Sequence, residues 1–437
     1  MKKVLAIALA LCMALTLGAS ALASSDKITL RFTNFYTEED VANNADARAR
    51  DYTMKKYAAD NADTLDIVFT ALTQSDYATK IQAQAAADDM PELFLTKGSW
   101  VENFAENGLL ADLTADFEKL PYKDDYYAGE FKSITYDGKI LGVPIQFVSP
   151  TSLMFSNKAI WEQAGYTEIP KTFDEIYQAV PKMQELGVTT IQLGNKENWP
   201  YESCWISCLG DRFTGTEWFN SILARDGQAK FTDEVFVDML RFTKELGASG
   251  VLNADFNSMT HDEAMTAYNQ GKAASFISGY WAVANIIGNA LPEVRENTVI
   301  TLLPQPANAK GGDPNSLSNS SGWFVSVSSK LEGEVRDAAV AMAFAINGPE
   351  YCENLAKESG ALGPIKVDMP EGNFDRLMME YNVIAGQYAS SGVPVYDVEL
   401  NGAIVEVMNS GLQEVLAGTM EPEALAELIQ AEQDALS

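Results

Sequence analysis

The sequence predicts a layered α/β fold, because strand-like and helix-like apolar patterns alternate through its N-terminal third. Residues 28–32 alternate apolar and polar side chains with a period of two, 65–72 is a more continuous apolar run, and 92–96 is a third short strand. This strand–helix alternation implies parallel pairing with right-handed crossovers. The stretches between and after the strands carry apolar residues at helical spacing: Val41, Met54 and Tyr57; Tyr77, Ile81 and Ala85; Phe104 and Leu109.

Length and composition predict a globular protein of two or three structural units. The chain has 437 residues, of which 47% are hydrophobic and 21% charged, as is typical of proteins with a packed core. Its 61 acidic residues outnumber 31 lysines and arginines, and the formal net charge is −30. Such a field repels phosphate polymers and anionic bilayers, which argues against nucleic-acid and peripheral-membrane roles. It suits a soluble protein that works outside the cytoplasm.

Residues 1–23 have the pattern of a secretory signal peptide. Two lysines precede the apolar stretch 4–17, and small residues before Ser24 favour cleavage after Ala23. Cys12 would be a lipidation site only after a small residue, and Leu11 precedes it, so we expect an unlipidated mature chain. No later window of about 18 consecutive apolar residues predicts a transmembrane helix.

The middle and C-terminal parts predict helices with recognisable N-terminal caps. Residues 172–175 and 260–263 both have the capping-box pattern, in which Thr and Glu satisfy backbone N–H groups at a helix start. Pro181 predicts a bend in the first of these helices. His261 falls in the first turn of the second, where we expect it to be exposed to solvent and disfavoured as a cation. The polar run 308–321 predicts a loop.

Histidine and cysteine usage argues against a metal site. One histidine cannot form a His-rich site, and Cys204, Cys208 and Cys352 match no zinc-ligand spacing. These three cysteines of the mature chain allow at most one disulfide. We expect all three to be small buried residues. A Cys204–Cys208 bridge is the alternative, although a spacing of four residues on a helix suits disulfide geometry poorly.

Two loops at the carboxyl ends of predicted strands are candidates for ligand binding. Asn34 and Tyr36 follow the first strand, and Lys97, Ser99 and Trp100 follow the third. Ligands of α/β sheets bind at such strand ends, and amide, hydroxyl and aromatic groups suit a small polar ligand. Each loop by itself more often has a purely structural role.

Several segments, in order along the mature chain, resemble one protein family. In their order and spacing they resemble the extracellular solute-binding proteins of ABC importers, specifically the carbohydrate-binding group that includes maltose-binding protein. The most specific stretch is similar to the family's crossover between lobes. The segments are 91–95 with 104–110, the crossover 137–144 with 156–165, the Gly-Lys to Gly-Tyr-Trp segment 271–281, the return crossover 322–328, and the closing helix region 413–422.

The resemblance implies an α/β architecture with two lobes, the type II fold of periplasmic binding proteins, and a ligand cleft between the lobes. Lobe 1 would comprise 24–147 plus about 325–370, and lobe 2 about 150–322 plus about 373–437. It also implies a monomer without a cofactor, a metal or a nucleic-acid partner. Its partners would be a small saccharide and the membrane subunits of an ABC importer.

The same resemblance implies ligand-binding residues on both lobes and at the crossover. Indole planes cover the apolar face of a pyranose ring, while amides and hydroxyls bind its hydroxyl edge. No arginine falls at a matched position and Lys97 is the one cation nearby, so a neutral mono- or oligosaccharide is favoured over an anionic ligand. Trp161 matches an apolar core position and is left out. The implied residues are Asn34, Tyr36, Ser99, Trp100, Gln146, Ser149, Trp199, Tyr201, Trp281 and Trp323.

Enzyme signatures do not support a catalytic function. The sequence has no nucleophile elbow, phosphate-binding loop, dinucleotide glycine motif or EF-hand pattern. Two alternatives stay open. A secreted glycoside hydrolase needs only two carboxylates, and Glu202 is the acid that stands out in the candidate cleft loops. A secreted carbohydrate-binding adhesion module is the other. We expect a binding protein, not an enzyme.

Overall fold

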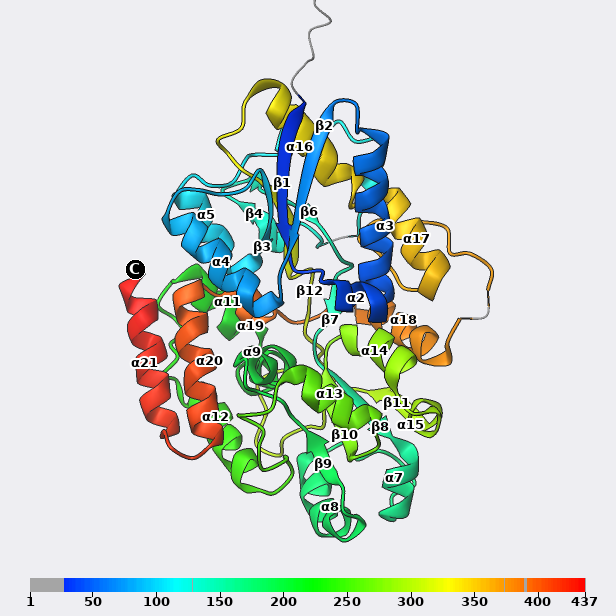
Figure 1. The fold of residues 1–437 in the computed structure, drawn as a ribbon. Helices are drawn as coiled ribbons and strands as arrows, with labels where there is room; N and C mark the ends of the chain where they lie inside the picture. Colours follow the sequence, from blue (N-terminus) through cyan, green and yellow to red (C-terminus); the bar gives the residue numbers. More distant parts are fainter. Residues whose placement is uncertain (1–26, 128, 373, 389–390, 437) are drawn as a thin grey trace, which may run out of the picture.

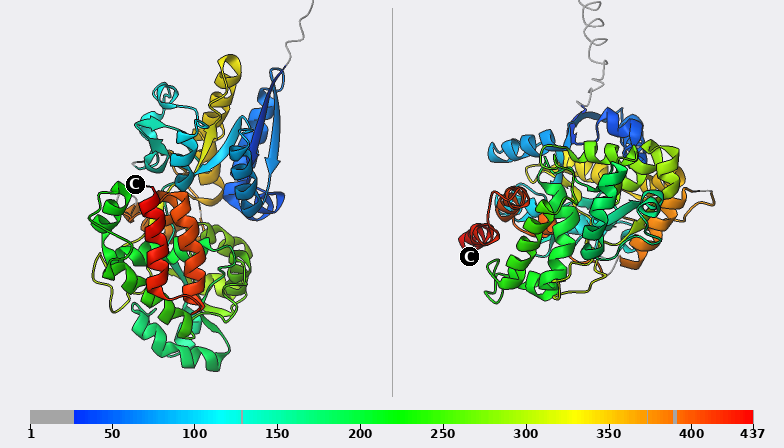
Figure 2. Two further views of the ribbon diagram at one scale, coloured as in Figure 1. Left: turned by 90° about the vertical axis from the view of Figure 1, so that its left-hand side faces the viewer. Right: turned by 90° about the horizontal axis from the view of Figure 1, so that it is seen from below.

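The computed structural model describes residues 27–127, 129–372, 374–388 and 391–436, and it has two lobes, each built around its own sheet (Figure 1). Figure 2 shows the lobes stacked on each other, with the C-terminal helices lying along the lower one. The predicted signal peptide, residues 1–23, and Cys12 lie outside the described residues. Among the helices that are described, none combines the length and apolar character needed to cross a membrane.

The first sheet contains the three strands predicted near the N-terminus. β1 pairs in parallel with both β2 and β3, whereas β13 runs antiparallel to β3 and β6. The parallel pairing predicted from the strand–helix alternation is therefore confirmed, and the carboxyl ends of β1 and β3 lie at one edge of the sheet. The strand order is β2 (Leu65–Ala71), β1 (Ile28–Asn34), β3 (Leu93–Lys97), β13 (Trp323–Val327) and β6 (Val143–Pro144).

Several helices of the first lobe bury apolar residues in the core around this sheet. The predicted helices around Met54 and Tyr77 are α3 and α4. Leu109 was expected in the helix α5, but that helix ends at Glu106, because Gly108 has a φ of +64° and the left-handed conformation terminates a helix. The helices are α2 (Glu38–Asn43), α3 (Ala45–Asp60), α4 (Gln74–Ala86), α5 (Val101–Glu106), α6 (Thr114–Phe117), α16 (Gly333–Ala345) and α17 (Pro349–Ser359), with short 3₁₀ turns η1 (Gly98–Trp100), η2 (Lys123–Asp125) and η3 (Lys132–Ile134) and a hairpin of β4 (Thr135–Tyr136) and β5 (Lys139–Ile140).

The second sheet is mixed and lies in the other lobe. β8 runs antiparallel to both of its neighbours, and β10 is parallel to β9. Its order is β11 (Thr298–Thr301), β8 (Leu153–Asn157), β10 (Ala273–Ser278) and β9 (Thr189–Gln192). Its helices are α7 (Lys158–Gln163), α8 (Phe173–Leu186), α9 (Trp199–Tyr201), the π-helical η4 (Glu202–Ile206), α10 (Ser207–Thr214), α11 (Thr216–Ala224), α12 (Glu234–Ala248), α13 (His261–Asn269), α14 (Trp281–Asn289), α15 (Pro292–Asn297), α18 (Arg376–Tyr388), α19 (Tyr396–Glu399), α20 (Gly402–Leu416) and α21 (Pro422–Ala435).

Both predicted capping boxes form. The Thr172 hydroxyl accepts from the backbone N–H of Glu175, whose carboxylate accepts from the Thr172 N–H in return, at the start of α8. Thr260 and Glu263 make the same reciprocal pair at the start of α13. Each box satisfies N–H groups that have no intrahelical partner, which is why these helices begin where the sequence predicts. Pro181 lies inside α8, which continues to Leu186.

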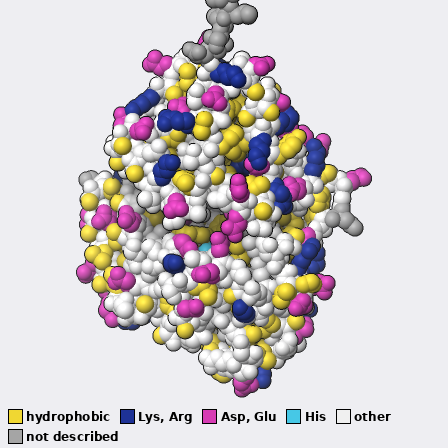
Figure 3. All heavy atoms as spheres, in the orientation of Figure 1, with side chains coloured by type: hydrophobic (Ala, Val, Ile, Leu, Met, Phe, Trp, Pro, Cys, Tyr) yellow, Lys and Arg dark blue, Asp and Glu magenta, His cyan; other side chains and the backbone are white. Residues whose placement is uncertain are grey.

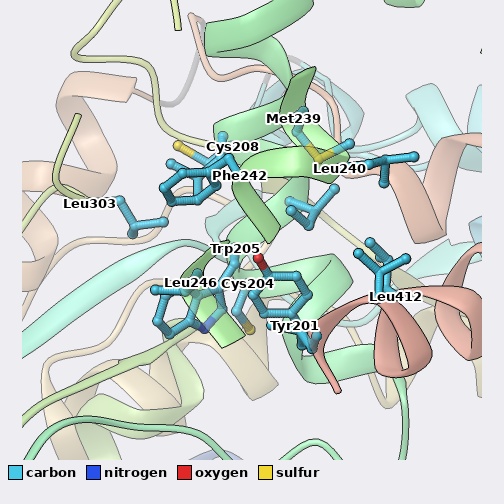
Figure 4. Close-up of a cluster of buried hydrophobic side chains, with 14 of the residues drawn as sticks. Tyr201, Cys204, Trp205, Cys208, Met239, Leu240, Phe242, Leu246, Leu303 and Leu412 are labelled. Carbon is cyan, nitrogen blue, oxygen red and sulfur yellow. The ribbon is translucent and has the colours of Figure 1, made fainter. Parts of the chain in front are cut away.

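The burial of all three cysteines confirms the prediction made for them. Figure 4 shows Cys204 and Cys208 among buried aromatic and aliphatic side chains, with Tyr201 and Trp205 beside Cys204 and Phe242 beside Cys208. Cys204, Cys208 and Cys352 are all buried free thiols. Trp161 is also fully buried, as expected for a core residue, and its indole N–H donates to Ser275 Oγ at 3.0 Å. Sulfhydryl and indole groups here serve packing.

Short connections join the lobes. The chain leaves the first sheet at β6, passes through β7 (Ser149–Pro150) into β8, and returns through β12 (Asn319–Ser320) to β13. β7 and β12 pair antiparallel with each other. Apart from β12, the predicted loop 308–321 is indeed without helix or strand. A further connection leads from α17 of the first lobe to α18, which packs in the second-lobe core. The residue boundaries assigned to the lobes from the sequence stay a prediction.

Candidate ligand-binding cleft

A hollow lies between the two lobes. Figure 3 shows hydrophobic side chains and the cyan of the chain's one histidine within it, with acidic side chains around its rim. The first sheet contributes its carboxyl edge to this region, and the second lobe contributes the turn from β10 to α14. Small ligands bind in concave, mostly apolar sites with a few polar groups, so the side chains at these two places form the candidate site.

The first lobe presents an aromatic cluster at its sheet edge. Trp100 ends the 3₁₀ turn that follows β3, and Trp323 begins β13, which pairs with β3 through Lys97. Their rings meet edge to face, with centroids 5.3 Å apart, and Phe35 packs on Trp323 at 4.9 Å. Both indoles are half-buried. Three segments far apart in the sequence thus place planar rings at one edge.

Polar groups accompany that cluster. Asn34 Oδ1 accepts from the backbone N–H of Tyr36 at 2.9 Å, which fixes the turn after β1. Asn34 Nδ2 is buried and has no hydrogen-bond partner among the described residues. Ser99 is buried in the turn between Lys97 and Trp100. Asn34 therefore retains a donor at the strand end, the position at which an α/β sheet binds ligands.

Arg50 lies beneath Tyr36 and was missed by the sequence analysis. Its guanidinium stacks on the rings of Tyr36 and Tyr351, at 4.9 and 4.2 Å from their centroids. It also contacts the carbonyl of Ile145, the side chain of Asn347 and, at 3.5 Å, Asp46. The residue is 1% exposed, and these contacts hold the guanidinium inside the first lobe, while its Nε has no hydrogen-bond partner among the described residues. The sequence contains one local indication of the Asp46–Arg50 ion pair, namely the spacing of four residues on a helix.

The second lobe presents Trp199, Trp281 and His261 together. The Trp199 and Trp281 rings lie 5.6 Å apart, and Trp199 packs on the imidazole at 4.9 Å. Trp281 Nε1 donates to His261 Nε2 at 3.1 Å, and Ser278 Oγ lies at the same distance from that nitrogen. Both indoles are half-buried, as on the first lobe.

The prediction that His261 is exposed was wrong. The residue is 6% exposed, and burial lowers its pKa to about 4. The capping box does begin α13 at this residue, but the turn after β10 and the loop before α9 fold over the ring. Trp281 and Trp199, which cover the ring, lie 20 and 62 residues away in sequence, so the local pattern could not reveal them.

Tyr201 does not join the site. It is fully buried in the second-lobe core, and its hydroxyl donates to Thr243 Oγ1 at 3.1 Å on α12. Glu202, the acid that the sequence placed in the cleft loops, is fully buried as well. Burial and the carboxylate of Asp397 raise the pKa of Glu202 well above its usual range. The register of the α9–η4 helical turn points both side chains inward.

The crossover residues connect the lobes next to the aromatic clusters. Tyr280, the residue before Trp281, donates its hydroxyl to Gln146 Oε1 at 2.9 Å. Tyr381 of α18 donates to Ser149 Oγ at 3.0 Å. Burial, and then Asp46 and Tyr36 of the first lobe, raise the pKa of Tyr280. Gln146 and Ser149 therefore already have partners within the protein.

A second set of contacts joins the lobes beside the C-terminal helices. Lys97, at the end of β3, forms an ion pair with the buried Asp397 of α19 at 2.5 Å. Glu102 of α5 accepts from Asn401 and forms an ion pair with Arg225 at 2.9 Å. The charge of Lys97 is thus paired with the carboxylate of Asp397. Among the described residues, no cluster of three or more His, Cys, Asp or Glu side chains could hold a metal ion.

A comparison with known families matches residues 44–347 to the model of bacterial extracellular solute-binding proteins. The match covers well over half of the chain. The chain belongs to this family. Its architecture agrees, since a solved chitin oligosaccharide binding protein superposes with a TM-score of 0.82 at 22% identity, covering 94% of this chain and 99% of the other. The two-lobed fold that the sequence predicts is confirmed.

Two curated relatives of this solute-binding protein are named as sugar-binding proteins. A probable sugar-binding periplasmic protein of Mesorhizobium japonicum is 27% identical over 161 residues, which are 37% of this chain and 34% of the relative. The maltotriose-binding protein of Pyrococcus abyssi is 24% identical over 235 residues, 51% of this chain and 44% of the relative. The matched region thus spans between a third and a half of these relatives. Among the structural relatives, a protein of Thermotoga lettingae with a TM-score of 0.72 at 17% identity, covering 94% of this chain and 99% of the other, is described as an ABC transporter solute-binding protein.

Proposed function

We propose that this solute-binding protein is the extracytoplasmic substrate-binding subunit of an ABC importer for a neutral mono- or oligosaccharide. The observation that carries the proposal is the pair of half-buried tryptophans on each lobe, Trp100 with Trp323 and Trp199 with Trp281. Indole faces match the C–H face of a pyranose ring, and nearby amide donors match its hydroxyls. The sugar-binding relatives support the same ligand class.

The charges near the cleft support an uncharged ligand. Arg50 is engaged by Asp46, Asn347 and a carbonyl, and Lys97 is paired with Asp397. A phosphorylated or carboxylated ligand would require a cation that is free to form a bidentate or charged contact. The acidic rim seen in Figure 3 also repels anions.

Closure of the lobes on the sugar would be the signal to the importer. A ligand that contacts both lobes favours the closed arrangement, because it gains contacts there that an open form lacks. β7, β12 and the connection to α18 would bend during this motion. The closed monomer would then present a surface formed by both lobes to the membrane subunits.

The proposal is tested by a thermal-shift screen of mono- and oligosaccharides, followed by calorimetry on the best ligand. A ligand that binds the folded state raises its melting temperature. Trp281→Ala should then weaken binding by about 2 kcal/mol or more while the protein stays folded. Trp218→Ala is the matched control, because Trp218 is a half-buried indole that packs on Phe236 in α12. Equal affinity of wild type and Trp281→Ala would contradict the site.

The hydrolase alternative predicts turnover. Purified protein incubated with p-nitrophenyl glycosides should release no nitrophenol if it only binds sugar. Glu202, the acid on which the alternative depended, is buried beside Asp397, which disfavours its use on a substrate in the cleft. Binding of an insoluble glycan, without soluble-sugar affinity, would favour the adhesion alternative.

We also propose export by a signal peptide cleaved after Ala23, without lipidation at Cys12. The apolar stretch 4–17 behind two lysines supports export, and Leu11 before Cys12 disfavours a lipid anchor. Mass spectrometry of the protein isolated from its host should give an N-terminus at Ser24. A diacylated Cys12 at the N-terminus would contradict this assignment.

A further inference from the structure

The two ring nitrogens of His261 are distinguished by their surroundings. An indole N–H can only donate a hydrogen bond, so Nε2, which receives Trp281 Nε1 at 3.1 Å, must be the unprotonated nitrogen. The hydrogen of the neutral ring therefore resides on Nδ1. Ser278 Oγ also lies 3.1 Å from Nε2 and can donate to it. One tryptophan thus determines the tautomer of the histidine.

The surroundings also keep the ring uncharged at neutral pH. Trp199, Trp281 and Phe276 surround it, and none of these can stabilise an imidazolium by hydrogen bonding. The carboxylate nearest in contact, Glu197, accepts from the backbone N–H of His261 at 3.1 Å. Asp262 follows in the chain, and burial raises the pKa of that carboxyl. Desolvation lowers the pKa of His261 to about 4 despite these acids.

Nδ1 has no hydrogen-bond partner among the described residues, and the imidazole is visible in the hollow between the lobes (Figure 3). We propose that neutral His261 donates its Nδ1 hydrogen to a hydroxyl or ring oxygen of the bound sugar, while its Nε2 holds the indole of Trp281 in place. This inference rests on the proposed function. If His261 donates this hydrogen bond, the site selects ligands that carry an oxygen acceptor next to the sugar ring stacked on the tryptophans.

The tautomer can be tested without any ligand. The chain has one histidine, so an untagged protein labelled with ¹⁵N-histidine gives one pair of ring-nitrogen signals. The assignment expects a protonated Nδ1 and an unprotonated Nε2 from about pH 5.5 to about pH 8. An Nε2-protonated ring, or titration near the ordinary histidine pKa, would overturn it. Addition of the bound sugar should shift the Nδ1 signal, and an unchanged Nδ1 would overturn the contact.

Two variants separate the two roles of the ring. In His261→Gln the longer amide reaches the Nε2 position, so it can accept from Trp281 but lacks the Nδ1 donor. In His261→Asn the shorter amide reaches the Nδ1 position and leaves Trp281 without its acceptor. Both should weaken sugar binding about tenfold, since each loses one hydrogen bond that the site provides. For a deoxy sugar that lacks the contacted oxygen, His261→Gln and wild type should bind with the same affinity.

Tyr268→Phe is the matched control. Tyr268 lies two turns further along α13, is fully buried, and shares a hydrogen bond of 2.9 Å with Thr298 Oγ1. This variant should lose stability but keep its affinity. If wild type binds sugar and His261→Gln binds it equally well, the donor role is overturned while the proposed function stands. If wild type binds no saccharide in the panel, the proposed function falls and the contact falls with it.

Discussion

Gly279 lies directly beneath the indole of Trp281. A Cβ atom placed on Gly279 would come within 2.2 Å of Trp281 Cζ3 and 2.3 Å of Cη2. Only glycine leaves room for the ring in this position beside the turn between β10 and α14. The orientation of this tryptophan is therefore set from below by a missing side chain and at its edge by His261.

Gly279→Ala should displace the Trp281 ring and weaken sugar binding at least about tenfold, because a clash at 2.2 Å requires the indole to move. Calorimetry with the best saccharide measures this. Gly386→Ala is the control, since a Cβ there meets no atom within 4 Å and the residue lies within α18. That variant should keep its affinity. Wild-type affinity in Gly279→Ala would exclude the clash as a determinant of the site.

Glu130 connects the two crossing segments near the hinge. It is fully buried, and its carboxylate accepts from the N–H of Val148 at 2.8 Å and from Ser321 Oγ at 2.7 Å. Burial raises its pKa from 4.5 to about 8. The titratable groups around it are Tyr126, Tyr127, Cys352 and Tyr381, so a cation does not offset its charge.

Glu130→Gln should make the protein more stable at alkaline pH. Between pH 4.5 and about 8 the unfolded chain ionises Glu130 while the folded protein keeps it protonated, so stability falls as pH rises through that window. The variant lacks this loss. Its free energy of unfolding should therefore exceed that of wild type by up to about 4 kcal/mol at pH 8 and should not differ near pH 4. Denaturant melts across pH measure the difference. The exposed Glu427→Gln should follow wild type.

Lys97 and Asp397 should show asymmetric costs on substitution. Lys97→Met leaves the carboxylate of Asp397 buried and unpaired beside Glu202, at a cost of about 3 kcal/mol. Asp397→Asn should cost less, because the partly exposed ammonium of Lys97 can reach solvent. The double variant should recover part of the loss in a double-mutant cycle. Lys244→Met, at an exposed pair with Glu421, should change stability by less than about 1 kcal/mol.

His261 should make folding sensitive to acid. Its pKa is depressed from 6.5 to about 4 in the folded state, so the unfolded chain takes up the proton first as pH falls. Stability is therefore lost progressively between pH 6.5 and about 4, by about 3 kcal/mol in total. His261→Gln should lack this contribution in urea melts compared with wild type. If the free energy of unfolding changed with pH in the same way in both proteins, His261 would not be neutral in the folded state.

Local sequence patterns were sufficient to predict features that depend on residues close together in the sequence. The period-two run at 28–32 and the Thr–Glu pairs at 172–175 and 260–263 depend on neighbours within a few residues, and the structure confirms them. The burial of the cysteines followed from their apolar character, and that of Trp161 from the family position that it resembles. Leu109 was misplaced although Gly108 carried a local helix-ending signal.

The amino-acid sequence alone determined the α/β class, the order of the lobes' elements and the family, because these depend on periodicity, caps and the order of motifs. Tertiary structure decided which side of each helix faces another element. It buried His261 under Trp199 and Trp281, turned Tyr201 and Glu202 into the core, and brought Arg50 beneath Tyr36. Burial depends on contacts between segments that are distant in the sequence, and a short-range sequence pattern does not specify these contacts.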